Sequence, residues 1–180
     1  MAAAPHRLLL ALAALAAASV LGGCGFTPLY ARPGVTGALS TIQVDIPRGQ
    51  ASEGASMIVN RIGFLLNEDL EDELATNRQL KPNYRLDVTL DERNYQRGLT
   101  VNDVNTRNET HVWVRYSLVD LASGKVLKTG MEPVEVSYAA ANDPYAGVTA
   151  QQDAQERAAS TAADWLRVDL AAYFAGRDPQ

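Results

Sequence analysis

The fold is decided by the stretch His111-Val112-Trp113-Val114-Arg115-Tyr116-Ser117-Leu118-Val119-Asp120-Leu121. Successive side chains of a strand point to opposite faces, so this stretch has one apolar face and one mixed face. The apolar face consists of Val112, Val114, Tyr116 and Leu118, and the mixed face of Trp113, Arg115, Ser117 and Val119. The alternation predicts a strand of a sheet that is covered on its apolar side and wet on the other.

Neighbouring segments predict the strands that pair with it. Residues 84–90 alternate in the same way before it. After it, the turn at 122–125 leads into residues 126–138, a further strand in which Gly130 and Pro133 are the positions most open to an interruption. Together these strands form an antiparallel meander.

Residues 93–109 allow two interpretations. They are either a loop or a continuation of the two flanking strands as a long hairpin. Asn102-Asp103, flanked by Val101 and Val104, suits the turn of such a hairpin because Asn and Asp tolerate positive φ. We favour the extended hairpin.

Two further segments have the three-and-four spacing of amphipathic helices. The first runs from Ser52, which can cap its start, to Thr76, and its apolar stripe consists of Val59, Ile62, Leu66, Leu70 and Leu74, widened by Ile58 and Leu65. The second is predicted to begin at Thr149, since Thr149 and Gln152 have the form of a capping box, and to end at Gly176. Each helix thus has one face to bury.

Residues 41–46 alternate with period two and predict one more strand, so the order is strand, helix, strand, strand, strand, helix. This order predicts an α+β fold. The expected architecture is a two-layer sandwich with both helices on one face of a mainly antiparallel four-stranded sheet. The position of the first strand beside or between the others stays open. We assign residues 41–176 to this single domain and residues 177–180 to a C-terminal tail.

Residues 1–23 have the pattern of a secretory signal peptide. Met1 to Arg7 carries one arginine and no acidic residue, and Leu8 to Leu21 is almost wholly apolar. That run of about 14 residues is shorter than the roughly 20 that a membrane-spanning helix needs. The alternative is an ordinary buried helix.

Cys24 is the only cysteine, so it has no partner for an internal disulfide. Leu21-Gly22-Gly23-Cys24 looks like a bacterial lipobox, which predicts cleavage between Gly23 and Cys24 and an N-acyl diacylglycerol anchor on Cys24. Gly25 at the next position favours the outer membrane. Residues 24–40, with their prolines and glycines, suit neither a helix nor a central strand and are predicted to form a lipidated tether.

Cleavage would leave 180 − 23 = 157 residues and, with the loss of Arg7, a net charge of −5 − 1 = −6. An acidic chain argues against a nucleic-acid binder that is held by phosphate contacts.

Catalytic signals are weak. His6 leaves with the signal peptide, His111 stands alone, and Asp91 and Glu92 point to opposite faces of their strand. The acidic run at 68–73 is interpreted as a solvated helix face. The sequence therefore predicts no enzyme, no cofactor and no metal site.

Basic residues favour binding instead. Arg93, Arg97 and Arg107 cluster around the predicted hairpin, and Lys125 and Lys128 lie at or after the next turn. Such residues can hold anionic phosphates through charge-assisted hydrogen bonds. The alternative is a solvated sheet edge whose charges discourage aggregation.

A family resemblance runs through nearly the whole mature chain. Cys24-Gly25-Phe26-Thr27-Pro28-Leu29-Tyr30 resembles the mature start of the LptE family of lipopolysaccharide-assembly lipoproteins. The likeness continues, in order, through Leu86 to Leu90, Thr106-Arg107, Tyr116 to Asp120, Gly124 to Leu127, Ser137-Tyr138, Pro144 to Ala146, and Asp153 to Ala159. The opening heptapeptide is the most specific part, and the other pieces persuade by their order.

The resemblance implies a small α/β sandwich that sits as a plug inside the outer-membrane β-barrel LptD. It implies help in assembling that barrel and binding of lipopolysaccharide on its way to the outer leaflet. Position and charge make Arg97, Arg107, Lys125 and Lys128 the candidate contacts to lipopolysaccharide. The acidic chain makes the plugging role the more secure of the two. The alternatives are a periplasm-facing auxiliary lipoprotein of an ABC-type lipid transporter and a structural outer-membrane lipoprotein.

Overall fold

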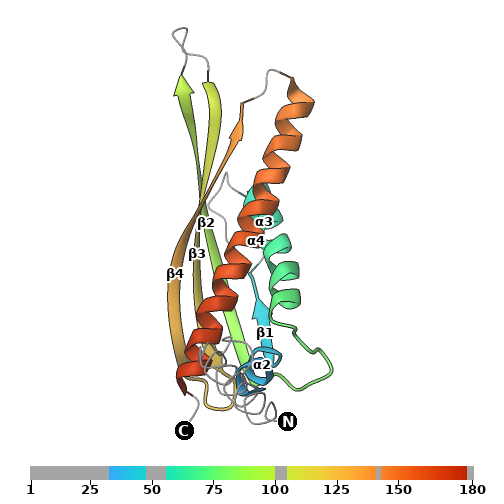
Figure 1. Cartoon of the computed structure of the whole chain (residues 1–180), viewed down its shortest axis with the longest axis vertical. Helices are drawn as coiled ribbons and strands as arrows, with labels where there is room; N and C mark the ends of the chain where they lie inside the picture. Colours follow the sequence, from blue (N-terminus) through green and yellow to red (C-terminus); the bar gives the residue numbers. More distant parts are fainter. Residues whose placement is uncertain (1–32, 48–55, 100–104, 141–142, 178–180) are drawn as a thin grey trace, which may run out of the picture.

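A four-stranded sheet carries helices on one of its faces, and no helix or strand of the described residues covers the other face (Figure 1). The computed structural model describes residues 33–47, 56–99, 105–140 and 143–177. In chain order the elements are α2 (Pro33–Leu39), β1 (Ile42–Asp45), α3 (Ser56–Glu73), β2 (Tyr84–Leu99), β3 (Asn105–Asp120), β4 (Val126–Ala139) and α4 (Pro144–Arg177). The predicted α+β fold and the order of its strands and two long helices are confirmed.

The sheet has the strand order β1-β2-β3-β4. β2, β3 and β4 form the predicted antiparallel meander, and β1 lies at the edge, parallel to β2, with Ile42 opposite Tyr84. The sheet is therefore mixed. α3 connects β1 to β2, because two parallel neighbours need a crossover that brings the chain back to its starting side.

The long hairpin is confirmed over the described residues. β2 and β3 stay in register from Tyr84 opposite Asp120 to Leu99 opposite Asn105. The turn that we predicted at Asn102-Asp103 lies outside the described residues.

The core lies between the sheet and the helices. α3 contributes a stripe with the predicted spacing, and α4 contributes an alanine-rich stripe that lets the helix approach closely. The fully buried side chains with the largest volume are Ile42, Ile62, Leu66, Leu70, Leu74, Leu86, Leu118, Leu166 and Leu170. Each buried leucine or isoleucine contributes about 1.5–3 kcal/mol of transfer free energy, so this layer holds the two halves of the sandwich together.

The prediction that residues 24–40 suit no helix is wrong for Pro33–Leu39, which form α2. Proline is favoured at the first position of a helix, where its missing N–H costs nothing. Val35 and Leu39, one turn apart, are buried in the core, while Gly37 lies on the exposed side. The apolar pair with helical spacing outweighs the local preference of proline and glycine for loops.

The predicted start of α4 at Thr149 is also wrong, because the helix begins at Pro144. The carboxylate of Asp143 accepts hydrogen bonds from the backbone N–H groups of Tyr145 (2.8 Å) and Ala146 (3.0 Å), so Asp143 is the cap. The hydroxyl of Thr149 instead donates to the carbonyl of Tyr145 inside the helix. Gly176 does not end the helix, which continues to Arg177.

β4 runs without interruption through Gly130 and Pro133. Pro133 is tolerated because β4 is an edge strand. Gly130 lies directly opposite Tyr116 of β3, and the phenol ring occupies the space that a side chain at position 130 would need. A glycine at this point lets the aromatic ring cross the strand toward α4.

Candidate functional site

The uncovered side of the sheet is the candidate site, and we call it the open face. It carries the side chains of β2, β3 and β4 that alternate with the buried ones. Its members around the long hairpin are Asp91, Arg93, Tyr95 and Arg97 of β2, Arg107, Glu109, His111, Trp113 and Arg115 of β3, and Met131 and Glu135 of β4. This part of the molecule combines aromatic, cationic and anionic groups.

A hollow of about 210 Å³ lies on the open face, lined by Asp91, Arg93, Trp113, Arg115 and Met131. The guanidinium carbon of Arg93 lies 5.6 Å from the centre of the Trp113 ring, a cation–π distance. Met131 is 54% exposed although it is apolar. The hollow thus brings the apolar side chains of Trp113 and Met131 together with two arginines and one aspartate, and its apolar and cationic groups suit a ligand with both acyl and phosphate groups.

Arg97 and Arg107 lie directly opposite each other on β2 and β3. Arg97 Nε lies 3.0 Å from Glu109 Oε2, and its guanidinium lies 5.4 Å from the centre of the Tyr95 ring. The hydrogen bond from Arg97 holds the pKa of Glu109 below its usual value, and His111 adds to this effect. The structure therefore brings together two of the four predicted contact residues.

The other two predicted residues lie at the opposite end of the sheet. Lys125 is exposed in the turn between β3 and β4, about 40 Å from Arg107 along β3 at the usual rise of a strand. Lys128 points toward α4, where its Nζ lies 2.8 Å from Asp169 Oδ1 and 5.8 Å from the centre of the Tyr173 ring. A ligand that binds Lys128 would have to break the ion pair between Lys128 and Asp169.

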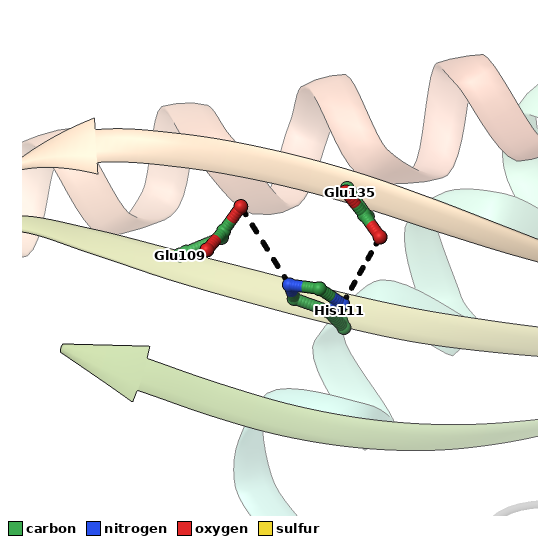
Figure 2. Close-up of side chains that lie close together, drawn as sticks. All are labelled: Glu109, His111 and Glu135. Carbon is green, nitrogen blue, oxygen red and sulfur yellow. Dashed lines mark ion pairs between the residues drawn. The ribbon is translucent and has the colours of Figure 1, made fainter. Parts of the chain in front are cut away.

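The sequence suggested that His111 stands alone, but in the structure it has two carboxylates beside it. Figure 2 shows its ring between two carboxylates, with Nε2 3.6 Å from Glu109 Oε1 and Nδ1 3.2 Å from Glu135 Oε1. Tyr95 packs edge-on against the imidazole at 4.9 Å between ring centres. Glu109 could have been found from its i, i+2 spacing to His111, but Glu135 is brought in only by the register between β3 and β4.

The acidic run on α3 is a surface feature, as predicted. Glu71 forms an ion pair with Arg78, and Glu73 Oε2 lies 2.7 Å from Arg167 Nε. Partial burial and the neighbouring carboxylates raise the pKa of Asp69. In the described ranges, the group of His and acidic side chains with the spacing of a metal site is the one around His111.

Asp91 and Glu92 do point to opposite faces. Asp91 lines the hollow, whereas Glu92 turns toward the helices, where its Oε1 accepts a hydrogen bond from Asn94 (2.8 Å). Its Oε2 is buried and has no hydrogen-bond partner among the described residues. Burial is the main reason that the pKa of Glu92 is raised.

This burial predicts a pH-dependent stability. The native pKa of Glu92 lies above the unfolded value of about 4.3. Between these two pKa values the native state keeps a proton that the unfolded chain has released. The free energy of unfolding therefore falls as the pH rises through this range. Glu92→Gln should lack this decrease. We expect the variant to be more stable than the parent by about 1 kcal/mol at pH 7, with the difference disappearing below about pH 4.

Urea unfolding at a series of pH values measures this difference. Glu156→Gln is the control, because its carboxylate is 58% exposed and forms a surface ion pair with Arg61, so its replacement should change the free energy of unfolding at pH 7 by no more than about 0.5 kcal/mol. A Glu92→Gln variant that is less stable than the parent at pH 7 would show that the carboxylate is stabilising.

Gly23 and Cys24, the predicted cleavage site and lipidated residue, lie outside the described residues. Among the described helices, none combines the length and the apolar character needed to cross a membrane.

Comparison with known protein families gives one match. The family model described as LptE, lipopolysaccharide-assembly, matches residues 39–169. A candidate lipoprotein from Caulobacter crescentus CB15 is similar in structure, with 35% identity, a TM-score of 0.65, and coverage of 82% of this chain and 99% of that one.

More distant solved structures include rare lipoprotein B from Shewanella oneidensis, with 13% identity, 73% and 93% coverage and a TM-score of 0.48. A minor lipoprotein from Acinetobacter baumannii has 13% identity, 71% and 92% coverage and a TM-score of 0.45. No functionally curated protein matches the chain.

Proposed function

Since this chain belongs to the LptE family of lipopolysaccharide assembly, we propose that it plugs the outer-membrane β-barrel LptD, assists its assembly and binds lipopolysaccharide during delivery to the outer leaflet. The match over residues 39–169 is the observation that carries the proposal. An acylated Cys24 would anchor the protein in the outer membrane, with the domain on the periplasmic side and within the barrel lumen.

The protein is a lipopolysaccharide-assembly lipoprotein of the LptE family, which is non-enzymatic. Membership in this family confirms the prediction that the chain is not an enzyme.

The chemistry of the open face supports lipopolysaccharide as the ligand. Lipopolysaccharide presents phosphates next to acyl chains, and Arg97 opposite Arg107 lies on the same face as Trp113 and Met131 of the hollow. Guanidinium groups bind phosphate with paired, charge-assisted hydrogen bonds. The overall acidity of the chain is therefore compatible with a local anion site.

Replacing Arg97 and Arg107 together with glutamine should weaken lipopolysaccharide binding by about 10- to 30-fold, because two exposed charge-assisted contacts are each worth about 1 kcal/mol. Both side chains lie on the open face, outside the core. The fold should therefore survive, which circular dichroism would verify. Binding of purified lipopolysaccharide can be measured by fluorescence competition.

The matched control removes the same charge from the exposed segment between α3 and β2, at Arg78 and Lys81, which are not candidate contacts. Arg78→Gln combined with Lys81→Gln should leave binding within about twofold of the parent, since screened charges at this distance contribute little. Equal losses in both double variants would assign the effect to net charge and remove Arg97 and Arg107 from the site.

The barrel partner is tested by affinity purification of the lipidated protein from outer membranes. We expect a detergent-resistant complex with LptD. Recovery with an inner-membrane ATPase complex instead would overturn the proposal. Cys24→Ser should abolish labelling by a palmitate analogue, and labelling that persists would exclude Cys24 as the acylated residue.

A further inference from the structure

His111 lies in a three-residue group that the proposed function does not use (Figure 2). His111 and Glu109 alternate on β3 and so share the open face, and Glu135 of β4 lies directly opposite His111. One potential ligand atom from each of the three side chains lies within 4.8 Å of the other two. The backbone register therefore fixes the origins of all three groups on rigid strands.

The imidazole has one unsatisfied atom. Nε2 is buried, has no hydrogen-bond partner in the described part of the chain, and faces Glu109 Oε1 at 3.6 Å. A lone pair on Nε2 is repelled by the carboxylate oxygen that it faces, and either a proton on Nε2 or a metal cation between the two atoms removes this repulsion. The distance is too long for a hydrogen bond but close to the ~3.4 Å that separates two ligands of a tetrahedral ion with bonds of about 2.0–2.2 Å.

We propose that Glu109, His111 and Glu135 bind a divalent transition-metal cation of the zinc type. His111 Nε2 supplies the nitrogen ligand, and one oxygen of each carboxylate supplies the others. A fourth position stays open to water, as is usual where the protein gives three ligands. Glu135 has to swing from Nδ1 toward the ion, and its side chain is 58% exposed and therefore has room to do so.

Neighbouring side chains already orient Glu109 and His111 for binding. Arg97 holds Oε2 of Glu109, which leaves Oε1 turned toward the ring, and Tyr95 packs against the imidazole and limits its rotation. Groups that orient ligands in this way typically strengthen metal sites. The side chain of His111 is only 16% exposed, so little ordering is left to occur on binding.

The charges around the group select the kind of cation. Arg97 and Arg93 lie close by on β2 and repel any cation, so a purely ionic contact with the two carboxylates is weakened. Mg²⁺ and Ca²⁺ prefer oxygen ligands and gain little from an imidazole, whereas Zn²⁺ forms a strong bond to it. We therefore expect Zn²⁺ to bind and Mg²⁺ and Ca²⁺ to bind far more weakly.

The test is calorimetric titration of the untagged, metal-free protein with Zn²⁺. The parent should bind one Zn²⁺ per chain at this group. His111→Gln should weaken that binding by about 100-fold, and Glu109→Gln by at least about tenfold, because even supporting residues of metal sites cost 10- to 100-fold when they are replaced. Asp91→Asn is the matched control, since Asp91 is a carboxylate of the same face but lies outside the group.

A measurement on the parent protein avoids any dependence on folded variants. In imidazole ¹⁵N spectra, Zn²⁺ should shift the Nε2 resonance of His111 more than the Nδ1 resonance. An unchanged ring spectrum at saturating Zn²⁺ would overturn the proposal. So would equal weakening by Asp91→Asn and His111→Gln, which would assign the binding to general surface charge.

Discussion

Alanine in place of Gly130 should lower the free energy of unfolding by about 2–3 kcal/mol, as expected for overpacking at a rigid site. A Cβ at position 130 would lie 2.8 Å from Cζ and 2.9 Å from Oη of Tyr116, and closer still to Cε1. The ring cannot easily yield. Its hydroxyl donates to Asp169, and Trp165 packs edge-on against it at 5.7 Å between ring centres.

Gly147→Ala is the matched control in a denaturant-unfolding experiment. Gly147 lies inside α4, and a Cβ there would meet nothing within 4 Å. Alanine at that position should be neutral or stabilise by about 0.5–1 kcal/mol, because glycine costs entropy in a helix. A Gly130→Ala variant as stable as the parent would show that the ring of Tyr116 moves at little cost.

Asp169→Ala should lower the free energy of unfolding by about 2–3 kcal/mol, as much as Gly130→Ala. It removes the partner of both the Tyr116 hydroxyl and the Lys128 ammonium group. The carboxylate of Asp169 accepts the hydrogen bond of Tyr116 and also pairs with Lys128 Nζ at 2.8 Å. Tyr116 is buried, and desolvation together with Asp169 raises its pKa, so the phenol stays neutral and keeps its proton for the bond. The acid thus ties β3 and β4 to α4.

Asp164→Ala on the same helix is the control. Its side chain is 58% exposed and pairs with Arg167 at 3.3 Å, so its loss should change stability by no more than about 0.5 kcal/mol. Thermal unfolding followed by circular dichroism measures both variants. Similar small effects at positions 164 and 169 would mean that the Tyr116 contact contributes no net stability. The double variant Gly130→Ala and Asp169→Ala should be less than additive, since both changes act on one ring.

Local patterns in the sequence predicted much of the fold. The alternation in β3 identified both faces of the sheet, and the three-and-four spacing from Ile62 to Leu74 identified α3. The start of α4 also has a local signal, since Asp143 is a cap and Pro144 a first helical residue, but Thr149 and Gln152 form a competing signal one turn further on. For α2, the two core contacts of Val35 and Leu39 outweighed local propensity.

The candidate site was less accessible from the sequence because it depends on register. A two-residue turn at Asn102-Asp103 would pair Arg97 with Asn108, one residue away from the observed partner Arg107, so even the register of the hairpin had to come from the structure. Placing Glu135 opposite His111, or Met131 beside Trp113, needs the pairing of β3 with β4. That pairing contains a register shift between Leu118 and Val119 that no local signal announces.

The packing of α4 has a consequence for how a growing chain behaves. α4 contacts α2, α3, β3 and β4, so the apolar layer closes only after residues 144–177 have been made. Until then the meander presents an uncovered apolar surface, which makes the unfinished chain prone to aggregation. The same delay would make the nascent chain dependent on holding factors, and it ties completion of the domain to its final helix.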